Sequence, residues 1–195
     1  ERVLSTPPRQ MPYETIGSLY LTFPDTASVA NYRRDLDLDT AIARTSYTTG
    51  GTTFTRQVFA SPVDQVIVVR LTATRPGQIA FRASMATPLH ATVTASPEGT
   101  IVVAGVNGDG VGKTADGQPL TGALTFQTRV RVLADGGQTT ANGDTVSVSG
   151  ANAATLLIAA ATSYVRFDDV SGNPEARTRE TIARAAPKLF YALRD

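Results

Sequence analysis

The sequence predicts an all-β fold, either a sandwich or a barrel, followed by a helical C-terminal stretch. Three observations support this: short segments of alternating or β-branched residues, turns rich in glycine and proline between them, and helical periodicity after residue 173. The 195 residues allow one large domain or two small ones.

The first half of the chain contains six expected strands. The Gly50-Gly51 pair accepts positive φ and predicts a hairpin turn, and Pro76-Gly77 interrupts the next apolar stretch. The expected strands cover residues 32–47, 52–60, 65–74, 78–86, 90–96 and 100–104. Within 32–47, alternation is expected to place Leu36, Leu38 and Ile42 on one face.

The second half opens with a glycine-rich segment, 105–122, that is expected to be a long surface loop. Strands are expected to resume afterwards, and Ala153 to Thr162 is expected to be a buried final strand. Asp135-Gly136-Gly137 and Asn142-Gly143 both predict hairpin turns. The remaining expected strands cover residues 123–133, 138–141 and 144–149.

The C-terminal stretch has the signals of a helix. Asn173 is a suitable N-cap and Pro174 suits the first helical position, whereas Pro187 is expected to kink or split the helix. One apolar stripe is formed by Ile182, Ala186, Leu189, Phe190 and Leu193. This stripe is expected to need a partner, so the chain is interpreted as part of something longer.

Composition excludes several classes of function. The net charge of +1 gives no electrostatic reason to expect nucleic acid or an anionic membrane as partner. No apolar run approaches the roughly 18–20 residues that span a bilayer, and no signal segment is evident. Without cysteine there is no disulfide, thiolate metal site or thiol nucleophile, and His90 is the single histidine.

Three motifs resemble those of functional sites, but a structural interpretation is favoured for each. Residues 107–114 (NGDGVGKT) resemble a phosphate loop, yet Asn107 stands where glycine is required and no βαβ unit surrounds it. The triplet Asp35, Asp37 and Asp39 lacks the glycine and glutamate of a calcium loop. Asp168-Asp169 could bind a cation or a sugar hydroxyl, or simply solvate a loop before the helix.

His90 could belong to a catalytic triad only with a serine that no Gly-x-Ser-x-Gly elbow marks, so a strand-edge position is expected. Six aromatic residues could form a platform for sugar stacking, although core and cross-strand packing is favoured. They are Tyr13, Tyr20, Phe23, Tyr32, Tyr47 and Phe54. No catalytic, cofactor-binding or metal-binding residue is therefore predicted.

Several stretches in order resemble the amino-terminal domain of bacterial glycoside hydrolase family 95, whose members are chiefly inverting α-L-fucosidases. Residues 8–21 (PRQMPYETIGSLYL) resemble its RQMPYQPLGDLYL segment, and 32–41 (YRRDLDLDTA) its YRRELDLDTA strand. Residues 55–61 (TRQVFAS) and 64–71 (DQVIVVRL) are similar to its TREVFAS and DQVIVVRL. Residues 129–137 (RVRVLADGG) and 160–164 (AATSY) complete the likeness.

The resemblance implies a large antiparallel β-sandwich of the supersandwich type over residues 1–165, with its first strands missing. It implies a helical linker over 166–195 that leads to an (α/α)6 catalytic barrel of the same polypeptide. The general acid and the asparagine-activated water belong to that barrel, so no family catalytic residue maps onto this chain. Export to the periplasm or the cell exterior is what such families favour.

The expected function is a non-catalytic domain that supports the barrel of an α-L-fucosidase-like hydrolase. A fucosylated glycan would then be bound only by the full enzyme. Two alternatives remain open at this point: an independent carbohydrate-binding module, and the same domain of an α-L-galactosidase. This segment contains no residue that separates a galactosidase from a fucosidase.

Overall fold

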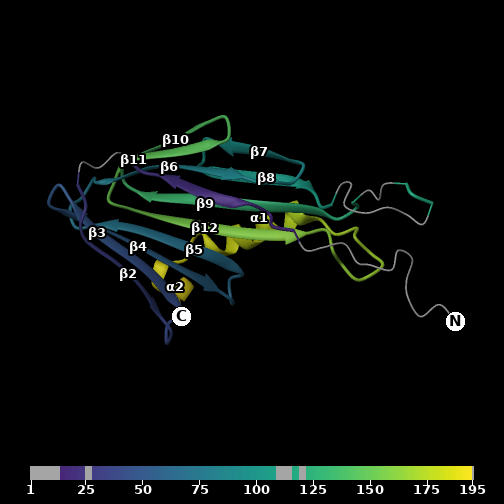
Figure 1. Ribbon diagram of the computed structural model, residues 1–195, viewed down its shortest axis with the longest axis horizontal. Coiled ribbons are helices and arrows are strands. Elements are labelled where there is room, and N and C mark those ends of the chain that lie inside the picture. The colour runs from purple at the N-terminus through teal and green to yellow at the C-terminus, as the bar shows by residue number, and fades with distance from the viewer. Residues whose placement is uncertain (1–13, 25–27, 109–115, 119–121, 195) are drawn as a thin grey trace.

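Two antiparallel β-sheets and two short helices make up the protein (Figure 1). The computed structural model describes residues 14–24, 28–108, 116–118 and 122–194. The strands are β1 (Ser18–Thr22), β2 (Ala30–Asp37), β3 (Ile42–Thr49), β4 (Thr52–Ser61), β5 (Val66–Ala73), β6 (Ile79–Ala86), β7 (Ala91–Ser96), β8 (Thr100–Val106), β9 (Thr125–Asp135), β10 (Gln138–Asn142), β11 (Thr145–Ala151) and β12 (Ala153–Thr162). The helices are α1 (Pro174–Ala185) and α2 (Phe190–Arg194). The predicted β-sandwich with a C-terminal helix is confirmed.

The two sheets differ in size. The large sheet has eight strands in the order β2-β3-β4-β5-β12-β9-β8-β7, and the small sheet has four in the order β1-β6-β11-β10. Every strand pair in both sheets is antiparallel. The last strand, β12, lies between β5 and β9 and so joins the two halves of the large sheet.

Glycine turns reverse the chain where the sequence predicts, but not every one of these turns joins two strands of the same sheet. The Asn142-Gly143 turn joins the paired strands β10 and β11, as expected for a hairpin. The hairpin predicted at Asp135-Gly136-Gly137 is wrong, because this turn leads from β9 in the large sheet to β10 in the small one. A side chain at Gly137, whose φ is +69°, would come within 2.3 Å of the Ser149 carbonyl oxygen. Only glycine satisfies both conditions at this corner.

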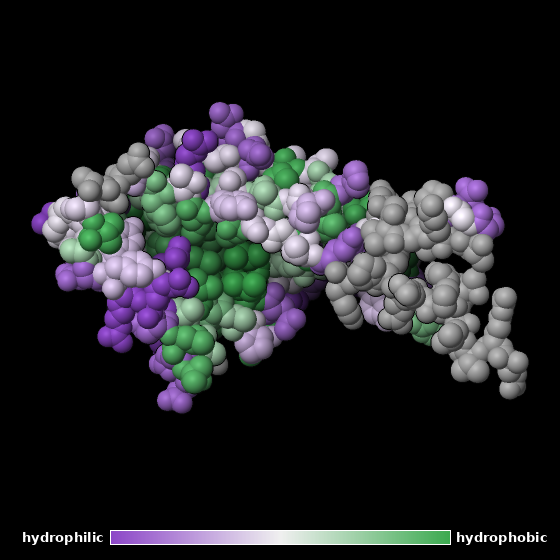
Figure 2. Space-filling model, viewed as in Figure 1, coloured by the Kyte–Doolittle hydropathy of each residue, from purple (hydrophilic) through white to green (hydrophobic). Residues whose placement is uncertain are grey.

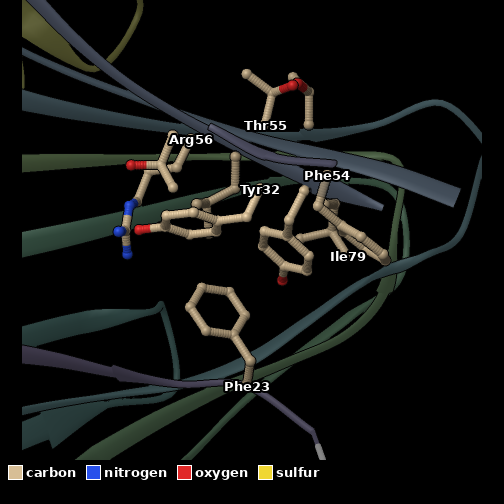
Figure 3. Close-up of a pocket in the computed structure, with 10 residues that line it drawn as sticks. Phe23, Tyr32, Phe54, Thr55, Arg56 and Ile79 are labelled. Carbon is tan, nitrogen blue, oxygen red and sulfur yellow. The ribbon is translucent and has the colours of Figure 1, made fainter. Parts of the chain in front are cut away.

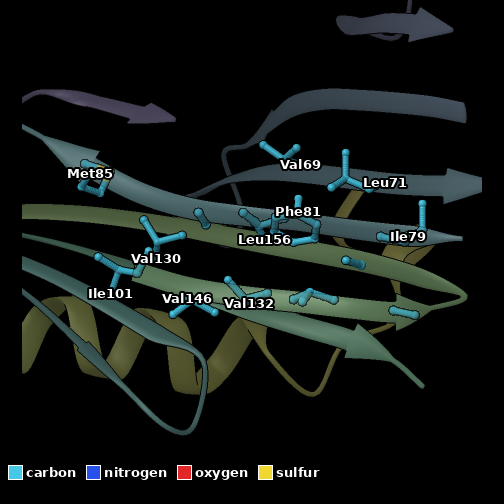
Figure 4. Close-up of a cluster of buried hydrophobic side chains, with 14 of the residues drawn as sticks. Val69, Leu71, Ile79, Phe81, Met85, Ile101, Val130, Val132, Val146 and Leu156 are labelled. Atoms are coloured by element: carbon cyan, nitrogen blue, oxygen red, sulfur yellow. The ribbon is translucent and has the colours of Figure 1, made fainter. Parts of the chain in front are cut away.

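The main hydrophobic core fills the space between the sheets (Figure 4). The expected strand at 78–86 is observed as β6, and its residues Ile79, Phe81 and Met85 all point into this core. They meet residues of the large sheet such as Val130 and Leu156, which are fully buried. Period-two alternation of this kind is expected of strands that bury one face.

The region 32–47 forms a hairpin instead of one alternating strand. The turn between β2 and β3 contains Leu38, and Ala41 there has a φ of +54°. Leu36 opposes Ala43, so Ile42 points to the other face of the sheet and is buried beneath the helices. The expected common face of Leu36, Leu38 and Ile42 is therefore wrong, because the turn breaks the strand period.

The helices form a third layer on the outer face of the large sheet. The Asn173 side chain accepts a hydrogen bond of 3.0 Å from the Ala176 amide, which confirms the predicted N-cap. The chain leaves helical structure around Pro187 and resumes as α2, so the predicted split is also confirmed. Neither helix, among the residues that the structure describes, is long and apolar enough to cross a membrane.

The apolar helical stripe has a partner within the chain, contrary to expectation. Ile182, Ala185 and Leu193 are buried against residues of β3, β4, β5 and β12 in a second core. The Phe190 ring meets the Phe59 ring edge-on, with 5.6 Å between centroids. Leu189 was expected in the same stripe but is 78% exposed, because the break at Pro187 shifts the helical phase.

Candidate functional site

An aromatic pocket lies at the opening between the two sheets, on the inner face of β3 and β4. It has a volume of about 170 Å³ and is lined by side chains from six separate segments of the chain. Figure 3 shows the Phe23 and Tyr32 side chains reaching into this space from opposite sides. The lining residues are Phe23, Tyr32, Thr45, Tyr47, Phe54, Thr55, Arg56, Leu71, Thr72 and Ile79. We call this cavity the aromatic pocket.

The Gly50-Gly51 turn explains how two of these rings meet. A two-residue turn fixes the register of its hairpin, and here it places Tyr47 opposite Phe54. The two rings stack with 5.4 Å between centroids and 20° between planes. On the opposite wall, Phe23 follows β1 and packs against Phe81 of the core with centroids 6.3 Å apart.

Among the residues that the structure describes, the polar groups that line the pocket belong to tyrosine, threonine and arginine side chains, and none is a carboxylate. Partial burial raises the pKa of the Tyr47 hydroxyl, and the nearby positive charge of Arg56 opposes that shift. The Tyr47 hydroxyl therefore stays protonated at neutral pH and can donate a hydrogen bond. Stacking on rings, hydrogen bonding to tyrosine and contact with one guanidinium are the interactions this pocket offers.

Structure brings together four of the six aromatic residues that the sequence singles out. Phe23, Tyr32, Tyr47 and Phe54 all line the aromatic pocket, whereas Tyr20 lies on the exposed outer face of β1. Tyr13 lies outside the described residues. Sequence reasoning missed Arg56, although the register set by Gly50-Gly51 already places it opposite Thr45 on the same face.

The aspartate triplet closes the β2–β3 turn. Asp37 accepts hydrogen bonds from the amides of Thr40 (3.2 Å) and Asp39 (3.0 Å), and Asp35 pairs with Arg33 at 2.9 Å. The hydrogen bonds of Thr40, chiefly that of its backbone amide, lower the pKa of Asp37. These contacts within the hairpin explain the positions of Asp35 and Asp37 without a bound cation.

Asp168 and Asp169 organise the loop between β12 and α1. Asp168 pairs with Arg166 at 2.8 Å, and Asp169 accepts a hydrogen bond of 2.9 Å from the Ser171 amide. The hydrogen bonds from Ser171, first that of its hydroxyl, lower the pKa of Asp169. Both carboxylates therefore stabilise the loop to which they belong.

His90 is an exposed residue in the turn before β7, and its carbonyl accepts a hydrogen bond from the Val106 amide. Most of the glycine-rich motif 107–114 lies outside the described residues. Asn107, at its start, donates its amide to the Leu124 carbonyl at 2.8 Å. Within the described part of the chain, no three histidine or acidic side chains come together as a group that could hold a metal ion.

A second surface feature is a compact exposed loop that holds apolar side chains outward. The backbones of Arg166 and Asp169 exchange hydrogen bonds of 3.0 and 3.1 Å across it. Arg177 of α1 fixes its start by donating to the carbonyls of Thr162 and Tyr164 at 2.7 and 2.8 Å. Its exposed large hydrophobic residues, which we call the 164–170 patch, are Tyr164, Val165, Phe167 and Val170.

The sequence over residues 1–166 matches the family described as the N-terminal domain of glycosyl hydrolase family 65. The chain belongs to this family. The likeness to the sandwich domain of α-fucosidases that the sequence indicates is thereby confirmed as a relationship to N-terminal domains of glycosyl hydrolases.

Two curated relatives of this family member carry α-fucosidase names. "Alpha-L-fucosidase 2" of Arabidopsis thaliana is 42% identical over 81 residues, which cover 40% of this chain and 10% of the relative. "Probable alpha-fucosidase A" of Aspergillus niger is 27% identical over 195 aligned residues, covering 93% of this chain and 23% of the relative. The chain therefore spans a quarter or less of the relatives it matches.

A solved structure supports the fold. The "putative kojibiose phosphorylase from human microbiome" matches 93% of this chain and 27% of its own length, with a TM-score of 0.55. The sequence identity is 11%, so this likeness is one of architecture alone.

Proposed function

We propose that the chain is the non-catalytic N-terminal domain of an inverting α-L-fucosidase-like glycoside hydrolase and supports an (α/α)6 catalytic domain of the same protein. The observation that carries the proposal is the family match over residues 1–166, combined with the α-fucosidase names of both relatives. The small share of each relative that the chain covers supports a role as one part of a larger enzyme.

The chemistry of inversion supports the non-catalytic part of the proposal. An inverting glycosidase needs a carboxylic acid and a base on opposite sides of the glycosidic bond, with carboxyl groups about 6.5–9.5 Å apart. No described residue that lines the aromatic pocket carries a carboxylate, and Asp37, Asp168 and Asp169 form hydrogen bonds or an ion pair within their own loops. The reacting pair is thus assigned to the catalytic domain.

The experiment is a kinetic comparison in the full-length protein, assayed on an α-L-fucoside. We expect Asp37→Asn, Asp168→Asn and Asp169→Asn each to keep kcat/KM within about twofold, whereas loss of a general acid or base costs about 100-fold or more. A fall of that size in any of the three variants would contradict the proposal. Turnover of the matching α-L-galactoside but not of the fucoside would instead favour the galactosidase alternative.

The supporting role is assigned to the 164–170 patch. An exposed apolar patch on a well-ordered loop is typical of a surface that another protein surface covers. The patch lies between β12 and α1, and hydrogen bonds from Arg177 fix its start. We assign this patch to contact with the catalytic domain.

The aromatic pocket favours one second candidate, a carbohydrate-binding function. Stacked rings beside hydrogen-bonding groups suit the apolar faces and hydroxyls of a sugar. In calorimetry of the full-length protein with a fucosylated oligosaccharide, this candidate predicts one binding site fewer in Tyr32→Ala and no change in Tyr20→Ala. Equal binding in both variants would eliminate it.

A further inference from the structure

The helical layer covers only part of the outer face of the large sheet. Helix α1 packs on β12 and β9, and α2 packs on β4. Beyond α1, Thr92 and Thr94 of β7 are exposed, and Val102 and Ala104 of β8 are half-buried. We call the outward side of these three strands the outer β7–β9 face. It consists of Thr92, Thr94, Ser96, Thr100, Val102, Ala104, Arg129 and Arg131.

Two arginines of β9 carry the positive charge of this face. Strand alternation turns Arg129 and Arg131 outward, because Val130 between them is fully buried in the main core. Arg131 donates to the Glu98 carbonyl oxygen and, at 3.2 Å, to the Thr100 hydroxyl. Neither arginine forms an ion pair with a residue that the structure describes. Two neighbouring guanidinium groups therefore have only neutral partners within the described chain.

The surroundings of Arg129 make its charge costly. Its Nη2 donates to Gln127 Oε1 at 3.2 Å, but its Nε–H group is buried without a hydrogen-bond partner among the described residues. Burial, followed by the nearby charge of Arg179, lowers the pKa of Arg129, and Glu175 opposes this shift. The Glu175 carboxylate is itself paired with Arg179. A half-buried charge of this kind destabilises the fold unless an anion pairs with it.

The other side chains of the face restrict the molecule to which such an anion belongs. Protein interfaces need a core of large apolar side chains, and neutral sugars and single-stranded nucleic acids need aromatic rings for stacking. Hydrophobic residues instead gather in the hollow between the two sheets (Figure 2), and no large exposed hydrophobic residue that the structure describes belongs to β7, β8 or β9. What remains on the face is a row of threonine and serine hydroxyls, which can exchange hydrogen bonds with sugar hydroxyls.

We propose that the outer β7–β9 face binds a polysaccharide that bears anionic groups, with Arg129 and Arg131 pairing with its sulfate or carboxylate groups. A guanidinium binds either group through two parallel hydrogen bonds. The two arginines stand two positions apart on one strand, about 6.6 Å, so one extended chain can reach both. The face lies on the opposite side of the large sheet from the aromatic pocket, and the proposal does not depend on the function proposed above.

The test measures binding of the full-length protein to immobilised dextran sulfate and polygalacturonate, with neutral dextran as the blank. We expect both anionic polymers, but not dextran, to bind the protein at low salt. Arg131→Gln should weaken this binding at least about fivefold, because a charge-assisted pair is lost. The control is Arg82→Gln on exposed β6, with unchanged affinity. Binding to one polymer alone supports the proposal and identifies the anionic group, whereas binding to neither, or equal losses in the two variants, would overturn it.

A second variant leaves both arginines and their packing intact. Strand register places Thr94 in one cross-strand row with Val102 and Arg129, and its side chain is exposed. Thr94→Glu should lower the affinity for dextran sulfate at least about tenfold, because its carboxylate repels the polymer and competes for Arg129. Thr140→Glu on exposed β10 adds the same charge and should lower it less than about twofold. Equal effects would overturn the proposal, as would a single-stranded oligonucleotide that binds as tightly as dextran sulfate.

Discussion

Asp64 and Lys188 form an ion pair that connects the second helix to the sheet beneath it. Asp64 is buried in the β4–β5 turn, where the Ser61 hydroxyl donates to it at 3.4 Å. The Lys188 ammonium reaches the same carboxylate at 2.5 Å from the segment between the two helices. A buried carboxylate needs such a partner, because burial of an unpaired charge is costly.

Loss of this lysine should destabilise the protein. Lys188→Met leaves the Asp64 carboxylate without its cation, and we expect the free energy of unfolding to fall by about 1–3 kcal/mol. Arg184→Met is the control, because its pair with Glu180 is exposed and such pairs contribute about 0.5 kcal/mol or less. Urea denaturation measures both. Equal losses in the two variants would contradict the assigned role of Asp64.

The stability that Asp37 contributes should decrease at acidic pH. Because folding lowers its pKa, Asp37 contributes stability above its unfolded-state pKa of about 3.9, and that contribution is lost as the pH falls through the lower folded value. A carbon-13 titration should therefore give a midpoint below about 3.9 in the folded protein and near 3.9 in urea. Identical midpoints would show that the turn hydrogen bonds have no effect.

At the scale of elements, Pro187 determines which side of the C-terminal segment is buried. An uninterrupted helix would place Leu189 and Leu193 on one face, four residues apart. The break at Pro187 instead leaves Leu189 exposed, whereas Leu193 is 2% exposed within the second core. The register of α2 on the sheet follows from this break.

These two leucines form a matched pair for mutation. We expect Leu193→Ala to lower the free energy of unfolding by about 2–4 kcal/mol, because it leaves a cavity under α2. Leu189→Ala should change it by less than about 0.5 kcal/mol, as is usual for exposed positions. Thermal melting of both variants is the measurement, and equal destabilisation would mean that the helix continues through Pro187.

At the scale of the whole molecule, the 164–170 patch should couple this domain to the catalytic domain. Phe167 is 91% exposed, so Phe167→Asp has little reason to destabilise the domain itself. In the full-length protein we expect it to lower Tm by at least about 4 °C, because a covered aromatic contact is lost. The control is Val63→Asp in the exposed β4–β5 turn, with unchanged Tm. An unchanged Tm for Phe167→Asp would remove the patch from the interface.

The sequence was sufficient for most of the strands and for the glycine turns, but it missed β1 and the turn between β2 and β3, and it did not assign strands to sheets. Alternation and glycine turns are local, so β4, β6 and the Gly50-Gly51 hairpin could be predicted from a few residues each. Turn chemistry reverses the chain without specifying the partner strand. The turn at Asp135-Gly136-Gly137 was therefore expected to form a hairpin, although it moves the chain from one sheet to the other.

The aromatic pocket was predictable only in part, for a related reason. The Tyr47–Phe54 pair follows from one hairpin and its register. Phe23 and Ile79 reach the same cavity from the small sheet, so their proximity depends on how the two sheets stack. The packing of α1 and α2 on the large sheet is likewise a long-range contact that helical periodicity alone does not specify.

Because β12 lies between the two halves of the large sheet, that sheet is completed late during synthesis. Strands β2–β5 and β7–β9 can each pair with sequence neighbours as they leave the ribosome, but their union waits for the strand that ends at Thr162. Until then, two partial sheets expose apolar surfaces and open edges. Closure through contacts that are distant in sequence is slow, so the apolar surfaces and open edges stay exposed to aggregation over this interval.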